Sequence, residues 1–289
     1  MAGRIAQSEQ PGLFVEPPRL FSCTPTKLVA FEECPRRYRF TYIDRPTPPK
    51  GPPWAHNSLG ASVHTALRAW FDLPSAKRGP AVVNSLLRAT WVREGYRDET
   101  QERLAYRRAL GWLRSYLEAL DPAHEPIAVE RTVGAKTETL ALSGRVDRID
   151  ETGGELVIVD YKTGRTGLGP DDARASRALA LYAFAAQKLF RRQCRRVELH
   201  HVPTGQVVAH EHTEESIARH VRRAEQTAAD AVAAEKATEA GEDPDATFPA
   251  TPGYICGWCD FRRSCPVGST RTGHDSWAGL DRGLELSPQ

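Results

Sequence analysis

Hydrophobic residues recur at helical spacing through the first 120 residues of the chain. Residues 22–25 (SCTP) are typical of a helix start, and apolar positions continue at helical intervals to Cys34. The Pro- and Gly-rich residues 46–53 predict a linker. Residues 59–71 carry Val63, Leu67 and Trp70 on one helical face. Two further helices are expected, at about 81–95 and 100–120.

The spacing changes from residue 127 onward. Short stretches there alternate between apolar and polar residues, or run apolar with Val and Ile, as strands do. A turn is predicted at residues 151–154 (ETGG). Strands are expected at 127–133, 139–149, 156–159, 196–202 and 206–212, with helices at about 172–190 and 213–239.

This order predicts one mixed α/β domain over residues 21–266. Its expected parts are a helical insertion at about 54–120, an α/β core at about 125–240, and a cysteine-rich segment at 250–266 that includes Cys34. Residues 1–20 and 267–289 are expected to be flexible tails. The chain has no apolar run long enough to span a membrane and no secretory signal at its N-terminus, so the cytoplasm is the expected location.

Charge alone does not separate the function classes, because 39 basic residues nearly balance 37 acidic ones. The basic residues are 32 Arg and only 7 Lys. Arg suits phosphate binding, although codon bias explains the same excess. The scarcity of Lys gives weight to any Lys that lies beside an Asp.

One such lysine follows a short apolar run. In residues 157–164 (VIVDYKTG), Asp160 and Lys162 point to the same side of a strand, because side chains alternate across its two faces. Asp147 ends the preceding strand and can lie beside Asp160. Two carboxylates and an ammonium are typical of a Mg²⁺ or Mn²⁺ site that hydrolyses phosphodiesters. The alternative is a set of ordinary charges at strand ends, which the buried strand before Asp160 disfavours.

The segments GRVDRID (residues 144–150) and VIVDYKTG resemble the RecB-like, AddB-like branch of the PD-(D/E)XK nucleases. The resemblance implies a restriction-endonuclease-like mixed sheet flanked by helices. It also implies that Asp147 and Asp160 bind the metal, that the backbone carbonyl of Tyr161 is a ligand, and that Lys162 assists catalysis. His64 fits the family's G-x-x-x-H-x-x-L pattern and is expected to be a further ligand.

The chain departs from the family at a later motif, Q-h-x-x-Y. Tyr182 is present, but Ala178 stands where the family has Gln. Contact between this helix and the substrate is therefore in doubt, and Tyr182 is either a substrate contact or a core residue.

Three cysteines near the C-terminus have the spacing of metal ligands. Cys256, Cys259 and Cys265 form C-x-x-C-x5-C, and Cys34 is the best candidate for a fourth ligand. Four thiolates suit zinc or an iron–sulfur cluster. The pattern is similar to the cluster of AddB-type and CRISPR-associated RecB-like nucleases, which implies a 4Fe–4S cluster that holds the two ends of the domain together. Cys23 and Cys194 are expected to be buried thiols.

Together these features predict a metal-dependent DNA nuclease, specifically an exonuclease on single-stranded ends in repair or recombination. The arginines around the cysteines, with Tyr38 and Trp258 for base stacking, are expected to line a DNA path. The alternatives are a non-catalytic nucleic-acid-binding module and a subunit of a helicase–nuclease complex. No Walker-type motif occurs, so any motor must be a separate chain. The arginines concerned are Arg36, Arg37, Arg39, Arg262 and Arg263.

Overall fold

Two short helices follow the first strand of the protein. The structure, a computed structural model, describes residues 20–281. Strand β1 (Phe21–Cys23) leads into α1 (Pro25–Glu33), which Thr24 caps by accepting the N–H of Lys27. Pro35 disfavours helical backbone at Cys34, so α2 (Pro35–Tyr42) starts as a separate helix. The strand β1 was not predicted, because three residues are too few to show a period.

The helical insertion consists of three main helices. They are α3 (Ala55–Phe71), α4 (Pro80–Thr90) and α5 (Glu99–Glu118), with a 3-10 turn at Ser75–Lys77. Leu67 and Trp70 of α3 are buried among residues of α4 and α5. Helix α5 lies within two residues of its predicted bounds, and the Asp98 side chain caps its start. The prediction that the preceding helix extends to about residue 95 is wrong, because Trp91 is extended and α4 ends at Thr90.

A mixed sheet of six strands forms the centre of the molecule. Strands β3, β4, β5 and β6 lie in chain order, β1 joins β3 in parallel, and β2 pairs antiparallel with β3. Gly153 and Gly154 have positive φ in the tight turn between β3 and β4. The predicted α/β class is confirmed. The remaining strands are β2 (Ala128–Lys136), β3 (Leu140–Thr152), β4 (Glu155–Lys162), β5 (Arg196–His201) and β6 (Gln206–Glu211).

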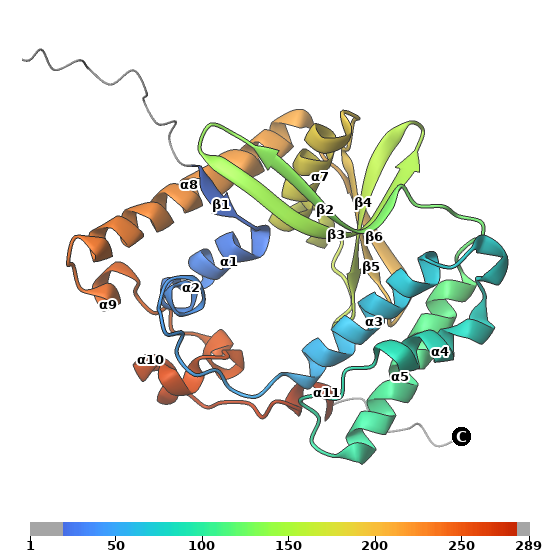
Figure 1. The fold of residues 1–289 in the computed structure, drawn as a ribbon, viewed down its shortest axis with the longest axis horizontal. Coiled ribbons are helices and arrows are strands. Elements are labelled where there is room, and N and C mark those ends of the chain that lie inside the picture. Colours follow the sequence, from blue (N-terminus) through green and yellow to red (C-terminus); the bar gives the residue numbers. More distant parts are fainter. Residues whose placement is uncertain (1–19, 282–289) are drawn as a thin grey trace, which may run out of the picture.

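Helices cover both faces of the sheet (Figure 1). On one face, α7 (Arg177–Phe190) and α8 (Glu214–Glu239) enclose a core with Ile149 and Ile158. On the other face, the helical insertion packs on Val157 and Val159. The single helix predicted at 172–190 is two helices, because Ser176 is extended and caps α7; the first is α6 (Asp172–Ala175).

The C-terminal part returns to the helical insertion. After α9 (Pro244–Thr247) come two 3-10 turns, η2 (Tyr254–Trp258) and η3 (Arg262–Ser264), and then α10 (Pro266–Ser269) and α11 (Ala278–Asp281). The expectation that the flexible tail begins at residue 267 is therefore wrong for residues 267–281. Leu280 is only 6% exposed and joins the core around α3.

The other parts of the predicted tails, residues 1–19 and 282–289, lie outside the described residues. Within the described part of the chain, no helix is long and apolar enough to cross a membrane.

Candidate active site and cysteine centre

Asp147 and Asp160 occupy matching positions on neighbouring strands. The antiparallel ladder between β3 and β4 ends at the pair Arg148–Val159, and the two aspartates come one step further in the same register. Asp147 therefore lies inside β3, because β3 continues alongside β2. The prediction that Asp147 ends its strand is wrong. The end of the ladder leaves backbone groups of this region available to side chains.

The residues after Asp160 complete this cluster. The backbone N–H of Tyr161 donates to Oδ2 of Asp147 over 2.8 Å. Lys162 lies on the same face of β4 as Asp160, and its Nζ is 2.6 Å from Oδ2 of that carboxylate. The structure thus brings Asp147, Asp160 and Lys162 into one site.

His64 reaches the site from α3. Its Nδ1 lies 3.3 Å from Oδ1 of Asp147, and its ring meets the ring of Tyr161 edge to face at 5.8 Å. Burial lowers the pKa of His64, but the hydrogen bond and the negative charge of Asp147 outweigh it and raise the pKa above its usual value. The imidazole is placed to bind either a proton or a metal ion.

Glu130 is the member of the site that sequence reasoning missed. It lies on β2 opposite Asp147 of β3. Val129 and Arg131 on either side pair with β3, but Glu130 does not. Its φ of 48° is rare for a residue with a side chain, and such a conformation costs about 1–3 kcal/mol. The carboxylate accepts a salt bridge from Arg145 at 2.7 Å. The only sequence signal is a Glu in the middle of a Val-rich strand.

The donor set suits a hard divalent cation. Within the described part of the chain, His64, Glu130 and Asp147 each offer a ligand atom within 4.8 Å of the other two. Burial and then the charge of Asp147 raise the pKa of Glu130. Burial also raises the pKa of Asp160, which Asp147 raises further and Lys162 lowers. Carboxylates that repel one another in this way, beside one imidazole, fit Mg²⁺ or Mn²⁺.

Tyr182 of α7 lies close to the aspartates. A Cβ at Gly144 would come within 2.5 Å of the Tyr182 ring, so the glycine lets this ring approach β3. Burial first, and then the charges of Asp160 and Asp147, raise the pKa of Tyr182 to about 12. Tyr182 therefore faces the site even though Ala178 replaces the family's Gln.

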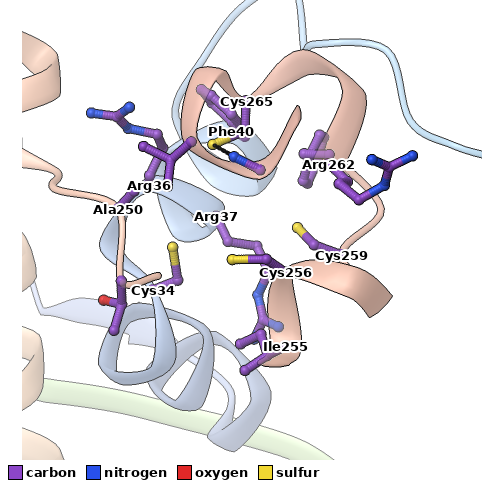
Figure 2. Close-up of a pocket in the computed structure, with 14 residues that line it drawn as sticks. Cys34, Arg36, Arg37, Phe40, Ala250, Ile255, Cys256, Cys259, Arg262 and Cys265 are labelled. Carbon is purple, nitrogen blue, oxygen red and sulfur yellow. Dashed lines mark hydrogen bonds between the residues drawn. The ribbon is translucent and has the colours of Figure 1, made fainter. Parts of the chain in front are cut away.

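Four cysteines from the two ends of the domain line one pocket. Figure 2 shows the sulfur atoms of Cys34, Cys256, Cys259 and Cys265 directed toward a shared space between α1–α2 and the C-terminal segment. Cys34 lies in the extended joint between α1 and α2. Cys265 starts α10, and its Sγ accepts the N–H of Gly268 at 3.4 Å.

The spacing of these sulfur atoms bears on what they could hold. Zinc binds thiolates at about 2.3 Å, so its four tetrahedral ligands lie about 3.8 Å apart. A cluster with one thiolate on each of several iron atoms spreads its ligands more widely. Four thiolates that converge in this way can hold one zinc ion or an iron–sulfur cluster.

The other two cysteines are buried, away from this pocket. Cys23 is 2% exposed and Cys194 is fully buried. Burial raises the pKa of the Cys23 thiol to about 11 and that of Cys194 to about 12. Neither thiol is poised to react.

Two of the arginines expected on a DNA path are structural. Arg36 is 7% exposed, and its guanidinium contacts Asp245 at 3.1 Å and the carbonyl of Phe248 at 3.4 Å. Arg39 also pairs with Asp245, at 2.9 Å. Both hold α2 against α9, so the expectation that Arg36 contacts substrate needs correction. Arg37 remains partly exposed and pairs with Glu33 along its own helix.

The two aromatic residues expected to stack on bases already make contacts within the protein. Tyr38 is 1% exposed, and its hydroxyl donates to Glu235 at 2.7 Å. The ring of Trp258 stacks on His274 with centroids 4.1 Å apart and contacts Trp54. Tyr38 is therefore a core residue, and Trp258 has one face covered.

Comparison with known proteins identifies one matching superfamily. The model of the PD-(D/E)XK nuclease superfamily matches residues 22–266. Among solved structures, the chain is similar to SSO0001, with a TM-score of 0.38 and 16% identity over 89% of each chain. It is also similar to a protein from Eubacterium rectale described as a "Putative exonuclease", with a TM-score of 0.46 and 8% identity over 82% of this chain and 86% of that chain. No curated protein matches the chain.

Proposed function

The chain belongs to the PD-(D/E)XK nuclease superfamily, and we propose that it is a Mg²⁺- or Mn²⁺-dependent exonuclease that degrades single-stranded DNA from an end. The observation that carries the hydrolytic part of this proposal is the meeting of Asp147 and Asp160 at one register position, with Lys162 Nζ 2.6 Å from Asp160. The preference for single-stranded ends is proposed from the family resemblance.

The proposed metal ligands are Asp147, Asp160, His64 and the backbone carbonyl of Tyr161. A divalent ion there would polarise the scissile phosphate and lower the pKa of the attacking water. Glu130 adds another carboxylate oxygen on the β2 side, within 4.8 Å of the ligand atoms of His64 and Asp147.

Lys162 has a separate role in the proposal. Its ammonium lies against Asp160 and its side chain is 48% exposed, so a phosphate can reach it. In this position it can orient the attacking water and offset the negative charge that develops on phosphorus in the transition state. Tyr182, beside the aspartates, is the proposed substrate contact on α7.

The cysteine centre is proposed to hold a 4Fe–4S cluster with a structural role. The family resemblance favours a cluster over zinc, and the four cysteines line one pocket. Cys34 and Cys265 belong to segments far apart in the sequence, so a shared cluster would close a long loop and hold the domain together. Arg37 lines the same pocket and is the remaining candidate among the nearby arginines for a DNA contact.

The rival function is a nucleic-acid-binding module without catalysis. A chain that had lost catalysis would be expected to have lost at least one of Asp147, Asp160 and Lys162. All three are present and adjacent, which favours the enzyme. We place the enzyme in DNA repair or recombination, where a separate helicase is the expected partner.

Digestion of end-labelled DNA tests the proposal. Single strands, duplexes and plasmid circles are incubated with Mn²⁺, with Mg²⁺ and with EDTA. An exonuclease shortens linear single strands in a metal-dependent way and leaves the circles intact. Cleavage of the circles would show that the protein is an endonuclease and not an exonuclease. A mobility shift without cleavage in either metal would favour the binding module.

A further inference from the structure

A network of buried polar groups lies behind the catalytic strand, on the face away from Asp147 and Asp160. Its centre is Arg148, which is 3% exposed. The guanidinium contacts Oδ2 of Asp150 at 3.0 Å and donates to the hydroxyl of Tyr161 at 3.0 Å and to that of Tyr116 at 3.4 Å. One cation thus links three residues from β3, β4 and α5.

Tyr116 and Asp150 each make a further polar contact within the network. The hydroxyl of Tyr116 lies 2.7 Å from Nδ1 of His200, whose Nε2 is 2.8 Å from Glu198. On the other side, Oδ1 of Asp150 lies 2.9 Å from Nε2 of His124. Replacing a buried ion pair by apolar residues often leaves stability unchanged or improved. Stability alone is therefore a poor explanation for this network.

Tyr161 connects the network to the metal site. Its backbone N–H donates to Asp147, and its ring meets the ring of His64 edge to face. Its hydroxyl, at the far end of a buried side chain, is held by Arg148. A residue fixed at both ends cannot shift its peptide without breaking one of these bonds.

We propose that Arg148 is a positioning residue that holds Tyr161 in place for metal binding. By anchoring the Tyr161 hydroxyl, Arg148 keeps the peptide that orients Asp147 and the ring that supports His64. The proposal rests on the proposed function, because it assigns a metal to the site that contains these residues. His124 holds Asp150, another partner of Arg148, but contacts none of the proposed ligands, so it provides a comparison within the same network.

Mn²⁺ binding to the full chain, measured from the electron paramagnetic resonance signal of free Mn²⁺, tests this proposal without relying on cleavage. Tyr161→Phe removes only the hydroxyl, and Arg148→Lys keeps the charge but cannot reach both tyrosines. Each variant is expected to weaken Mn²⁺ binding about tenfold, and the double variant is expected to be no weaker than either single one. His124→Ala, which also removes one contact of the network, is expected to bind Mn²⁺ as the original protein does.

The outcomes separate positioning from a purely structural role. Unchanged Mn²⁺ affinity in a folded Tyr161→Phe protein would overturn the proposal, as would an equal loss in His124→Ala. If the losses of Mn²⁺ affinity in the two single variants add in full in the double variant, Arg148 and Tyr161 act independently. That result would also contradict the proposal. Wild-type chain that binds Mn²⁺ but cleaves no DNA would overturn the proposed function and leave this inference standing.

Discussion

Lys162 Nζ lies 2.6 Å from Oδ2 of Asp160, two residues earlier on the same face of β4. Burial and the opposing Asp147 both favour the protonated form of Asp160, whereas the ammonium favours the charged form. The lysine thus helps to keep a carboxylate ionised at a place where its environment disfavours the charge. An ionised Asp160 is the form that can bind a metal ion.

Asp160→Asn and Lys162→Ala are each expected to reduce metal-dependent DNA cleavage by a factor of about 100 or more, because each removes a charge from the proposed site. The folded state should persist, since neither side chain belongs to the apolar core. Cleavage rates and circular dichroism melts measure the two properties separately.

Two exposed positions provide matched controls for these changes. Lys136→Ala and Asp230→Asn make the same chemical substitutions on the surface and should leave cleavage unchanged. Full cleavage by a folded Asp160→Asn protein would end the assignment of the active site.

Glu130→Gln is expected to raise the Mn²⁺ concentration needed for half-maximal cleavage by about tenfold, which corresponds to about 1.4 kcal/mol. The physical reason is the loss of a charged oxygen from the donor set that includes Asp147 and His64. Glu138→Gln, an exposed change in the hairpin between β2 and β3, is the control. A Glu130→Gln protein with the original Mn²⁺ requirement would remove Glu130 from the site.

Cys34→Ser is expected to abolish bound metal at the cysteine centre and to lower the melting temperature, because it disconnects the N-terminal helices from the C-terminal segment. Visible absorbance together with iron and zinc analysis measures the metal. Cys23→Ala changes a thiol outside the pocket and should keep the metal. A colourless wild-type protein with one zinc per chain would replace the iron–sulfur proposal by a zinc site.

Stability is expected to fall as the pH drops, in part because of His212. Burial is the main cause that lowers the pKa of His212 to about 4, and His210, His220 and Arg219 add to it. An unfolded histidine titrates near about pH 6.5. The unfolded chain therefore binds the proton more readily, so the contribution of His212 is complete above about pH 6.5 and is lost progressively toward pH 4, by up to about 3 kcal/mol.

Urea unfolding at about pH 7.5 and pH 5 checks this sign. His212→Gln has no proton to gain at this position, so its stability should change less between the two pH values. An equal change in both proteins would show that other groups cause the acid sensitivity.

Elements with a clear period could be predicted because burial of one face imposes that period on the sequence. The amphipathic α3 and the apolar run of β4 are examples. The break at Ser176 was missed because residues on both sides continue a helical pattern, and only the extended backbone of that residue separates α6 from α7. The order of residues 267–281 was missed because it depends on contacts with α3, which lies far earlier in the chain.

Chemistry that lies within one element follows from the order of the residues alone: strand alternation puts Asp160 beside Lys162, and local spacing puts Cys256 near Cys259. The folded arrangement is needed to identify the distant residues that join them. The register of β2 on β3 sets Glu130 opposite Asp147, and an ion pair with Asp245 holds Arg36 in a buried position. Register and long-range packing arise from the balance of all contacts in the fold, so no local pattern encodes them.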